Sequence, residues 1–221
     1  INLEKSTDSK KNLELQLSNN NIQANRFNAV NGKKLEDYSN DVKTYINKKG
    51  DWWDKAPLET QIGVALSHFK ILEEVANDPN LDINDNVMIL EDDVKIPDNF
   101  WEEIEPIKNQ IPNDFDMLLL GSNWGEGTNY SDNLLTNISG VGFHAYIVKK
   151  KFCIEMVNHF KKNKLNMAID TYFKDKIYKN KKYKIFLSKK NIITQNWDYK
   201  STISDRDMSH LKIDLYNKVV D

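Results

Sequence analysis

The sequence is organised around residues 87–94, which read Val87-Met88-Ile89-Leu90-Glu91-Asp92-Asp93-Val94. A short unbroken apolar run indicates a strand buried on both faces, as in a parallel sheet covered by helices. The three carboxylates that follow would repel one another, by about 2–4 kcal/mol per pair at a partly buried site. Because ligands of open α/β sheets bind at the carboxyl ends of strands, the triplet indicates a divalent cation with oxygen ligands. A solvated acidic turn is the alternative that these residues leave open.

The length and composition favour one globular α/β domain. The chain has 221 residues, of which 39% are hydrophobic and 29% are charged. We expect residues 1–221 to form a single domain with a peripheral C-terminal end of about 15 residues. The net charge of −2 argues against nucleic-acid binding. No apolar run reaches the roughly 20 residues that a transmembrane helix needs.

The cysteine content and the charge distribution bear on location. Cys153 is the single cysteine, so an internal disulfide cannot form and a reducing compartment such as the cytoplasm is expected. Lysines crowd residues 149–190. They form either a solvated face or a surface for an anionic acceptor or membrane, which would make the protein membrane-peripheral. Because the chain starts at Ile1 rather than at methionine, we also expect a preceding segment.

Hydrophobic periodicity predicts alternating helices and strands, and therefore a mostly parallel sheet flanked by helices. Thr7, Asp8 or Ser9 is expected to cap a first helix that runs through Leu13 and Leu17. The other predicted helices cover residues 57–76, 100–107, 151–160 and 171–178. The predicted strands cover residues 87–90, 115–121, 141–148 and 183–187. Residues 33–55 are read as a polar loop or lid, and residues 122–133 as a loop.

Familiar catalytic fingerprints are missing from the sequence: it has no dinucleotide or P-loop glycine motif, no G-x-S-x-G and no zinc-type Cys/His spacing. What remains is the carboxylate triplet, His144 beside Gly142, and Asp170 before a helix. The helix dipole should lower the pKa of Asp170 and keep it ionised, ready to accept a proton from an attacking hydroxyl. Plain helix capping is the alternative for Asp170, and a structural role is expected for His68.

Five segments, taken in order, resemble glycosyltransferase family 25, which contains bacterial lipooligosaccharide galactosyltransferases and collagen hydroxylysine galactosyltransferases. They are Ile1–Leu3, Arg26–Gly32, Gln61–His68, Ile89–Val94 and Gly142–Tyr146. The resemblance extends to about Ser204. It implies a GT-A fold and Mn²⁺ (or Mg²⁺). It also implies transfer of galactose or glucose, with inversion, from a UDP-hexose to a hydroxyl of a glycan, glycolipid or collagen-like acceptor.

The resemblance also implies roles for individual residues. Asp93, with Glu91, would hold the metal, and Asp170 would be the catalytic base. The residues implied in donor binding are Asn2, Leu3, Ser67, Asp92, Gly142, His144, Gln195 and Ser201. Gln61 and Val64 depart from the family pattern, since an acidic residue and a cysteine are expected there, and Glu4 and Lys5 replace the acidic-then-basic pair expected after Asn2-Leu3. Because Gln61 and Glu4 depart from the pattern, a catalytically inactive UDP- or sugar-binding domain of the same fold is the alternative function.

Overall fold

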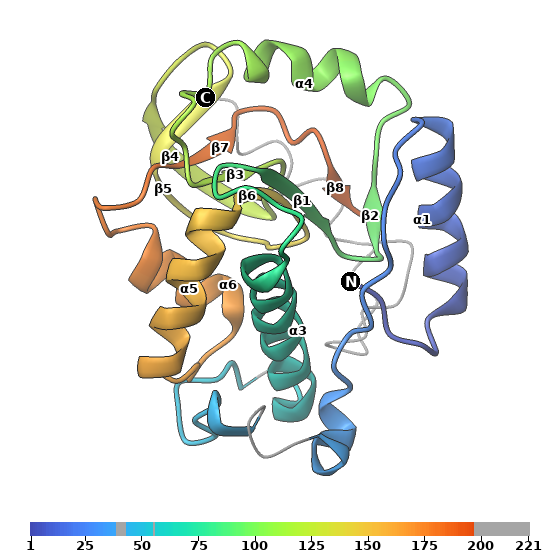
Figure 1. Ribbon diagram of the computed structural model, residues 1–221, viewed down its shortest axis with the longest axis vertical. Coiled ribbons are helices and arrows are strands. Elements are labelled where there is room, and N and C mark those ends of the chain that lie inside the picture. Colours follow the sequence, from blue (N-terminus) through green and yellow to red (C-terminus); the bar gives the residue numbers. More distant parts are fainter. Residues whose placement is uncertain (39–42, 55, 197–221) are drawn as a thin grey trace.

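The computed structural model describes residues 1–38, 43–54 and 56–196, which form a mixed α/β structure with a central sheet (Figure 1). The helical elements are α1 (Thr7–Asn19), η1 (Gly32–Asp37), α3 (Leu58–Asn77), α4 (Phe100–Lys108), α5 (Lys150–Lys162), α6 (Ile169–Tyr172) and the π-helical turn η2 (Phe173–Ile177). The strands are β1 (Asn86–Leu90), β2 (Val94–Lys95), β3 (Met117–Leu119), β4 (Trp124–Asn129), β5 (Leu134–Val141), β6 (Ala145–Lys149), β7 (Ile185–Ser188) and β8 (Thr194–Gln195).

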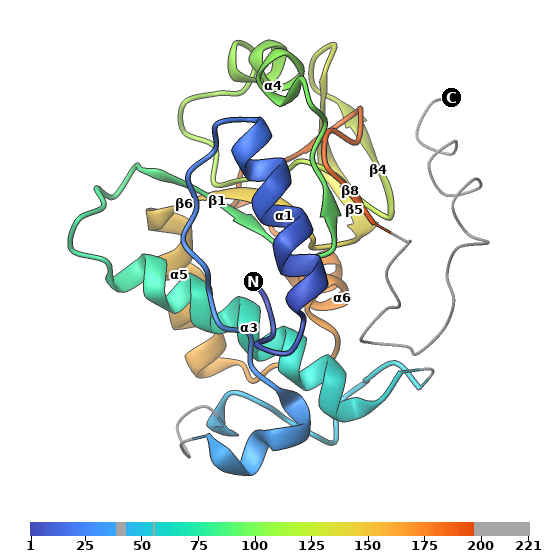
Figure 2. The same ribbon diagram turned by 90° about the vertical axis from the view of Figure 1, so that its right-hand side faces the viewer.

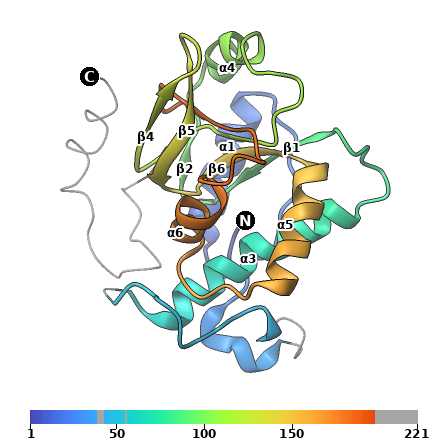
Figure 3. The ribbon, with the colours of Figure 1, turned by 90° about the vertical axis from the view of Figure 1, so that its left-hand side faces the viewer.

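The main sheet has six strands in the order β1-β6-β3-β7-β5-β4. Only the β3–β7 pair is parallel among these described strands, and the other four neighbouring pairs are antiparallel. The prediction of a mostly parallel sheet is therefore wrong. The reason is that β6 returns between β1 and β3, antiparallel to both, and that β4 and β5 form an antiparallel pair at the opposite edge (Figure 3). Alternation of helix and strand patterns does not fix strand direction.

Helices cover both faces of this sheet (Figures 1 and 2). On one face, α3, α5, α6 and η2 pack against the inward side chains of the sheet, including Ile89, Met117 and Tyr146. On the other face, α4 and the apolar side of α1 pack against Leu90, Leu118 and their neighbours. Successive residues Ile89 and Leu90 thus enter opposite cores, as the period of a strand requires. The prediction that this strand is buried on both faces is confirmed at its carboxyl end.

The acidic triplet occupies the connection between two sheets. The strand β1 ends at Leu90, and after Glu91, Asp92 and Asp93 the chain enters β2, which pairs with β8 in a separate two-stranded sheet. The backbone N–H of Glu91 donates to the carbonyl of His144, which extends the β1–β6 ladder by one bond (2.8 Å). The three carboxylates therefore lie in the short segment that connects the six-stranded sheet to the two-stranded sheet.

Two local predictions need correction. Residues 122–133 are not only a loop, because β4 occupies Trp124–Asn129 and pairs with β5. Its glycines and polar residues hide the strand pattern. The predicted strand at 141–148 is interrupted at Gly142, whose φ of +112° lies in the region that favours glycine. A Cβ there would lie 2.7 Å from the backbone nitrogen of Asn123, so the turn between β5 and β6 requires glycine.

The lysine-rich region has many partners within the chain. Lys161 pairs with Glu73, Lys182 with Glu155, Lys184 with Asp114 and Lys190 with Glu103. Lys150 donates to the carbonyls of Asp78 and Leu81. These contacts favour the interpretation of the region as a solvated, internally paired face. Within the described ranges, no helix is both long and apolar enough to cross a membrane.

Candidate functional site

A cavity of about 240 Å³ opens beside the acidic triplet. Four segments line it: residues 1–6, residues 29–33, one face of α3, and Glu91 to Asp93. The α3 face consists of Thr60, Val64, Ser67 and His68, which follow the spacing of one helical stripe. The cavity therefore joins the N-terminal segment, the loop before η1 and the end of β1 at one place.

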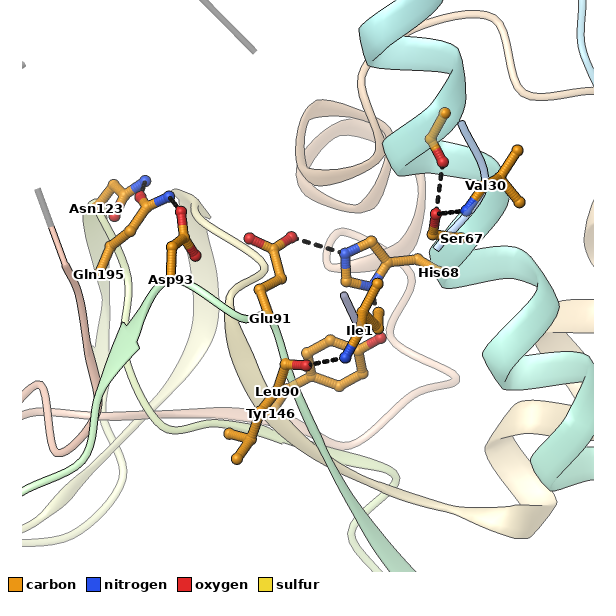
Figure 4. A network of polar contacts seen from close by, with 11 residues as sticks. Ile1, Val30, Ser67, His68, Leu90, Glu91, Asp93, Asn123, Tyr146 and Gln195 are labelled. Atoms are coloured by element: carbon orange, nitrogen blue, oxygen red, sulfur yellow. Dashed lines mark hydrogen bonds and ion pairs between the residues drawn. The ribbon is translucent and has the colours of Figure 1, made fainter. Parts of the chain in front are cut away.

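The three carboxylates have different partners, and Figure 4 shows two of them, Glu91 directed toward His68 and Asp93 toward Gln195. Glu91 faces α3, where its Oε1 lies 2.9 Å from Nε2 of the buried His68. The other ring nitrogen of His68 lies 2.8 Å from the hydroxyl of Tyr146. Burial alone would raise the pKa of Glu91, but the hydrogen bond and the charge of His68 outweigh it and lower this pKa below its ordinary value. Glu91 is therefore an ionised carboxylate with its own partner.

Asp92 fastens the N-terminal segment to the end of β1. Its Oδ2 accepts from Asn2 Nδ2 at 2.7 Å and from Ser9 Oγ at 2.5 Å. Asn2 also donates to the carbonyl of Ser6 and accepts from Arg26 Nε at 3.1 Å. The predicted cap at Thr7, Asp8 or Ser9 is wrong, because the N-cap of α1 is Ser6 and the Ser9 hydroxyl faces Asp92 and the Ser6 carbonyl instead. Asp92 lines the cavity, and Asn2 holds its carboxylate from behind the lining.

Asp93 is the carboxylate of the triplet whose hydrogen bonds are incomplete among the described residues. Its Oδ2 accepts from Gln195 Nε2 at 2.8 Å, and Gln195 Oε1 accepts from Asn123 Nδ2 at 3.0 Å. Its Oδ1 is buried and has no hydrogen-bond partner among the described residues. Burial, together with the negative charge of Glu91, raises the pKa of Asp93 from 3.8 to about 7. This carboxylate is the group in the triplet that a cation would satisfy.

The predicted donor-binding residues divide into two groups. Leu3, Ser67 and Asp92 line the cavity, whereas Asn2, Gly142, His144 and Gln195 are not among its lining residues. Ser201 lies outside the described residues. The donor-binding roles of all eight stay predictions.

Ser67 and His144 both have structural contacts. The Ser67 hydroxyl donates to the Gly63 carbonyl at 2.7 Å and accepts from the Val30 N–H at 2.8 Å, which ties α3 to the loop before η1. His144 is buried, and its Nε2 donates to the Ile193 carbonyl at 3.0 Å. Burial lowers the pKa of His144, so its imidazole is neutral at physiological pH.

Asp170 lies in the first turn of α6 rather than before the helix as predicted, and its pKa moves in the opposite direction from the expectation. Burial raises the pKa of Asp170, although the backbone N–H groups of Thr171 and Gly142 act to lower it, and the charge of Glu91 adds to the rise. The α6 helix has only 4 residues, so its dipole is weak beside the cost of burial. Asp170 is not the N-cap, which is Ala168. Its role as a base stays a prediction.

Sequence reasoning missed the role of Gln61. Its buried carboxamide accepts from the Trp53 N–H at 3.0 Å and donates to the carbonyls of Trp53 and Ala56 at 2.8 and 2.9 Å. A carboxamide can both donate and accept, and this geometry requires both. The glutamine at this position, where the family pattern suggested an acidic residue, therefore closes the loop before α3. Val64, at the expected cysteine position, lines the cavity.

Replacing Gln61 by glutamate should destabilise the protein by about 2–3 kcal/mol at neutral pH, because a carboxylate would face two carbonyl oxygens without a proton to donate. Chemical denaturation monitored by circular dichroism measures this loss. Glu59→Gln, an exposed exchange on the same helix, is the matched control and should change stability little. Equal stability of Gln61→Glu and the wild type would show that the carboxamide does not hold the loop.

With this geometry established, the comparisons with known proteins identify the class. Residues 1–195 match the family model described as glycosyltransferase family 25 (LPS biosynthesis protein). The chain therefore belongs to glycosyltransferase family 25. A comparison with curated proteins found no match. Family membership defines a transferase that uses a sugar donor and a glycan acceptor, with the cavity at the end of β1 as its candidate site.

Proposed function

We propose that this protein transfers galactose or glucose from a UDP-hexose to a hydroxyl of a glycan, a glycolipid or a collagen-like chain, with inversion at the sugar carbon and on a GT-A-type fold. The observation that carries the proposal is the cavity at the carboxyl end of β1, where the acidic triplet meets the N-terminal segment and α3 in a family 25 chain. Strand ends of α/β sheets are the usual place for such ligands. Leu3 would lie against the uridine.

A divalent cation, Mn²⁺ or Mg²⁺, fits Asp93 best. The buried Oδ1 without a partner among the described residues and the raised pKa indicate a carboxylate that a cation would satisfy. Such cations accept one or two carboxylates together with substrate phosphate oxygens and water. A bound cation would neutralise charge on the departing diphosphate. Glu91 fits less well, since its carboxylate already binds His68. The part of the chain described holds no cluster of three or more acidic, histidine or cysteine ligands.

Asp170 would accept the proton of the attacking hydroxyl. Its raised pKa brings it closer to the operating pH, which suits a general base. The influence of Glu91 on this pKa indicates that Asp170 lies within electrostatic reach of the triplet. The hydrogen bonds from Thr171 and Gly142 fix the orientation of the carboxylate (Thr171 N to Asp170 Oδ1, 2.6 Å).

The test is sugar transfer from a panel of UDP-hexoses with Mn²⁺ and with a chelator. Asp170→Asn should lower kcat by about 100-fold or more, the usual contribution of a general base, while UDP still binds. Asp175→Asn, an acidic residue of η2 paired with surface lysines, is the matched control. Unchanged kcat in Asp170→Asn would remove it as the base. Binding of UDP without turnover on any acceptor would instead support the inactive binding domain.

A further inference from the structure

Two lysines of the cavity stand out because they have no partner. Lys5 and Lys33 line the cavity and are exposed. Neither side chain makes an ion pair or a hydrogen bond within residues 1–38, 43–54 and 56–196, although many other lysines of the protein do. Hydrogen bonds hold the backbone at both positions. The Lys33 N–H donates to Asn31 Oδ1, and Asn2 Nδ2 donates to the carbonyl of Ser6, the residue after Lys5. These are free cationic groups on ordered segments.

Lys33 and Glu91 meet α3 at different turns. The neighbouring Gly32 packs against the Glu59 carbonyl, whereas Glu91 binds His68. Nine positions separate Glu59 from His68, which corresponds to roughly 13 Å along a helix. Because no carboxylate among the described residues pairs with Lys33, an anion supplied by a ligand is the natural partner of its side chain.

The remaining lining is mixed: Leu3, Val30 and Val64 give it apolar patches, and the other lining residues include polar side chains such as Ser67 and His68. The cavity thus offers apolar patches, hydrogen-bonding groups, two lysines and a group of carboxylates. A nucleoside diphosphate sugar carries the matching parts: a planar base, a doubly charged diphosphate, and hydroxyl donors on the sugar. A neutral sugar alone would leave both lysines unpaired.

We propose that Lys5 and Lys33 bind the phosphate groups of the nucleotide donor and thereby select a diphosphate over a nucleoside. This inference rests on the proposed function, since it assigns the anionic part of the donor to named residues. Lysine binds phosphate as a point charge with three rotatable donors, so a flexible, exposed side chain at the cavity rim suits the task. Neither residue was assigned to donor binding by the sequence reasoning.

The experiment measures the Kd of UDP, UMP and uridine by calorimetry for Lys5→Ala, Lys33→Ala and the double variant. Lys34→Ala and Lys11→Ala are the matched controls, because both lysines are exposed and do not line the cavity; Lys34 follows Lys33 in η1, and Lys11 lies in α1, the helix after Lys5. Each single variant should weaken UDP binding by about 5- to 10-fold, and the double variant by about 50-fold. Uridine binding should stay within about twofold of the wild type. Lys33→Arg should restore most of the affinity for UDP.

The outcomes below distinguish a failure of the lysine inference from a failure of the proposed function. Measurements with a chelator should show the same lysine dependence, since the lysines act without the cation. Equal UDP affinity in Lys33→Ala and Lys34→Ala would overturn the inference and leave the donor assignment intact. If the wild type does not bind UDP but binds pyrophosphate in a lysine-dependent way, the lysines are confirmed and the UDP donor is wrong. If it binds no diphosphate at all, the inference is overturned.

Discussion

Asp93→Asn should raise the free energy of unfolding at pH 8 while sugar transfer falls at least about 100-fold, because asparagine removes a buried charge and with it the proposed cation ligand. In the folded protein the pKa of Asp93 is raised from 3.8 to about 7. The folded state therefore keeps a proton that the unfolded state loses, and the wild type loses stability as the pH rises from about 4 to about 7. A shift of this size corresponds to at most about 4 kcal/mol.

The measurement is urea denaturation of both proteins across this pH range. The stability difference between Asp93→Asn and the wild type should be small near pH 4, grow toward pH 7 and then stay constant. Asp98→Asn, an exposed neighbour, is the control and should give a flat difference. Mn²⁺ should raise the melting temperature of the wild type but not of Asp93→Asn. A flat difference for Asp93→Asn, or transfer activity equal to the wild type, would contradict the assignment.

The second large effect is expected at Gly32. A Cβ on this residue would lie 1.6 Å from the Glu59 carbonyl oxygen and 2.9 Å from the Gly63 nitrogen, both of which are backbone atoms of α3. Gly32→Ala should therefore force η1 away from α3 and destabilise the protein by more than about 3 kcal/mol. Because Gly32 and Lys33 line the cavity, UDP affinity should fall as well.

A second glycine, Gly50, serves as the control that separates the loss of stability from the loss of UDP affinity. Gly50→Ala creates a similar clash, 1.9 Å from the Asn166 carbonyl oxygen, but Gly50 does not line the cavity. Thermal denaturation should show a comparable loss of stability for both variants. Calorimetry with UDP, at a temperature where both are folded, should show weakened binding only for Gly32→Ala. Equal UDP affinities would mean that the position of η1 does not matter for the donor.

Much of the fold could be predicted from local patterns. The helix α3 begins after Pro57 and ends at Asn77, and β1 carries the apolar run before the triplet, both as expected. Local patterns do not show which strands pair or in which direction. The return of β6 between β1 and β3 depends on contacts between segments far apart in the chain, whereas the local alternation of helix and strand predicts a mostly parallel sheet. The strand β4 was missed because its glycines and polar side chains resemble a loop.

The sequence indicates the acidic centre of the candidate site and some of its walls, such as Leu3 and Ser67, but not the partners of the carboxylates. Three adjacent carboxylates after a buried strand are visible in the sequence, whereas their separate partners are not. Glu91 meets His68 across 23 residues, and Asp93 meets Gln195 across 102 residues. Lys33 lay in a stretch taken for a polar lid, although Asn31-Gly32 before it marks the turn that delivers it to the cavity. Long-range hydrogen bonds decide which carboxylate is left with an unpartnered oxygen among the described residues.

The insertion of β6 beside β1 has a consequence for biosynthesis. Met88 pairs with Ile147, which follows 147 − 88 = 59 residues later. At ribosomal rates of 5–20 residues per second, β1 waits roughly 3–12 s for its partner strand. During this interval Ile89 and its apolar neighbours have no edge to join, and the nascent chain is a target for chaperones. A ribosome stalled before β6 would hold a chain in which the partners of Glu91 and Asp92, namely His68, Asn2 and Ser9, are already made, whereas the partner strand of β1 and the Gln195 partner of Asp93 are not.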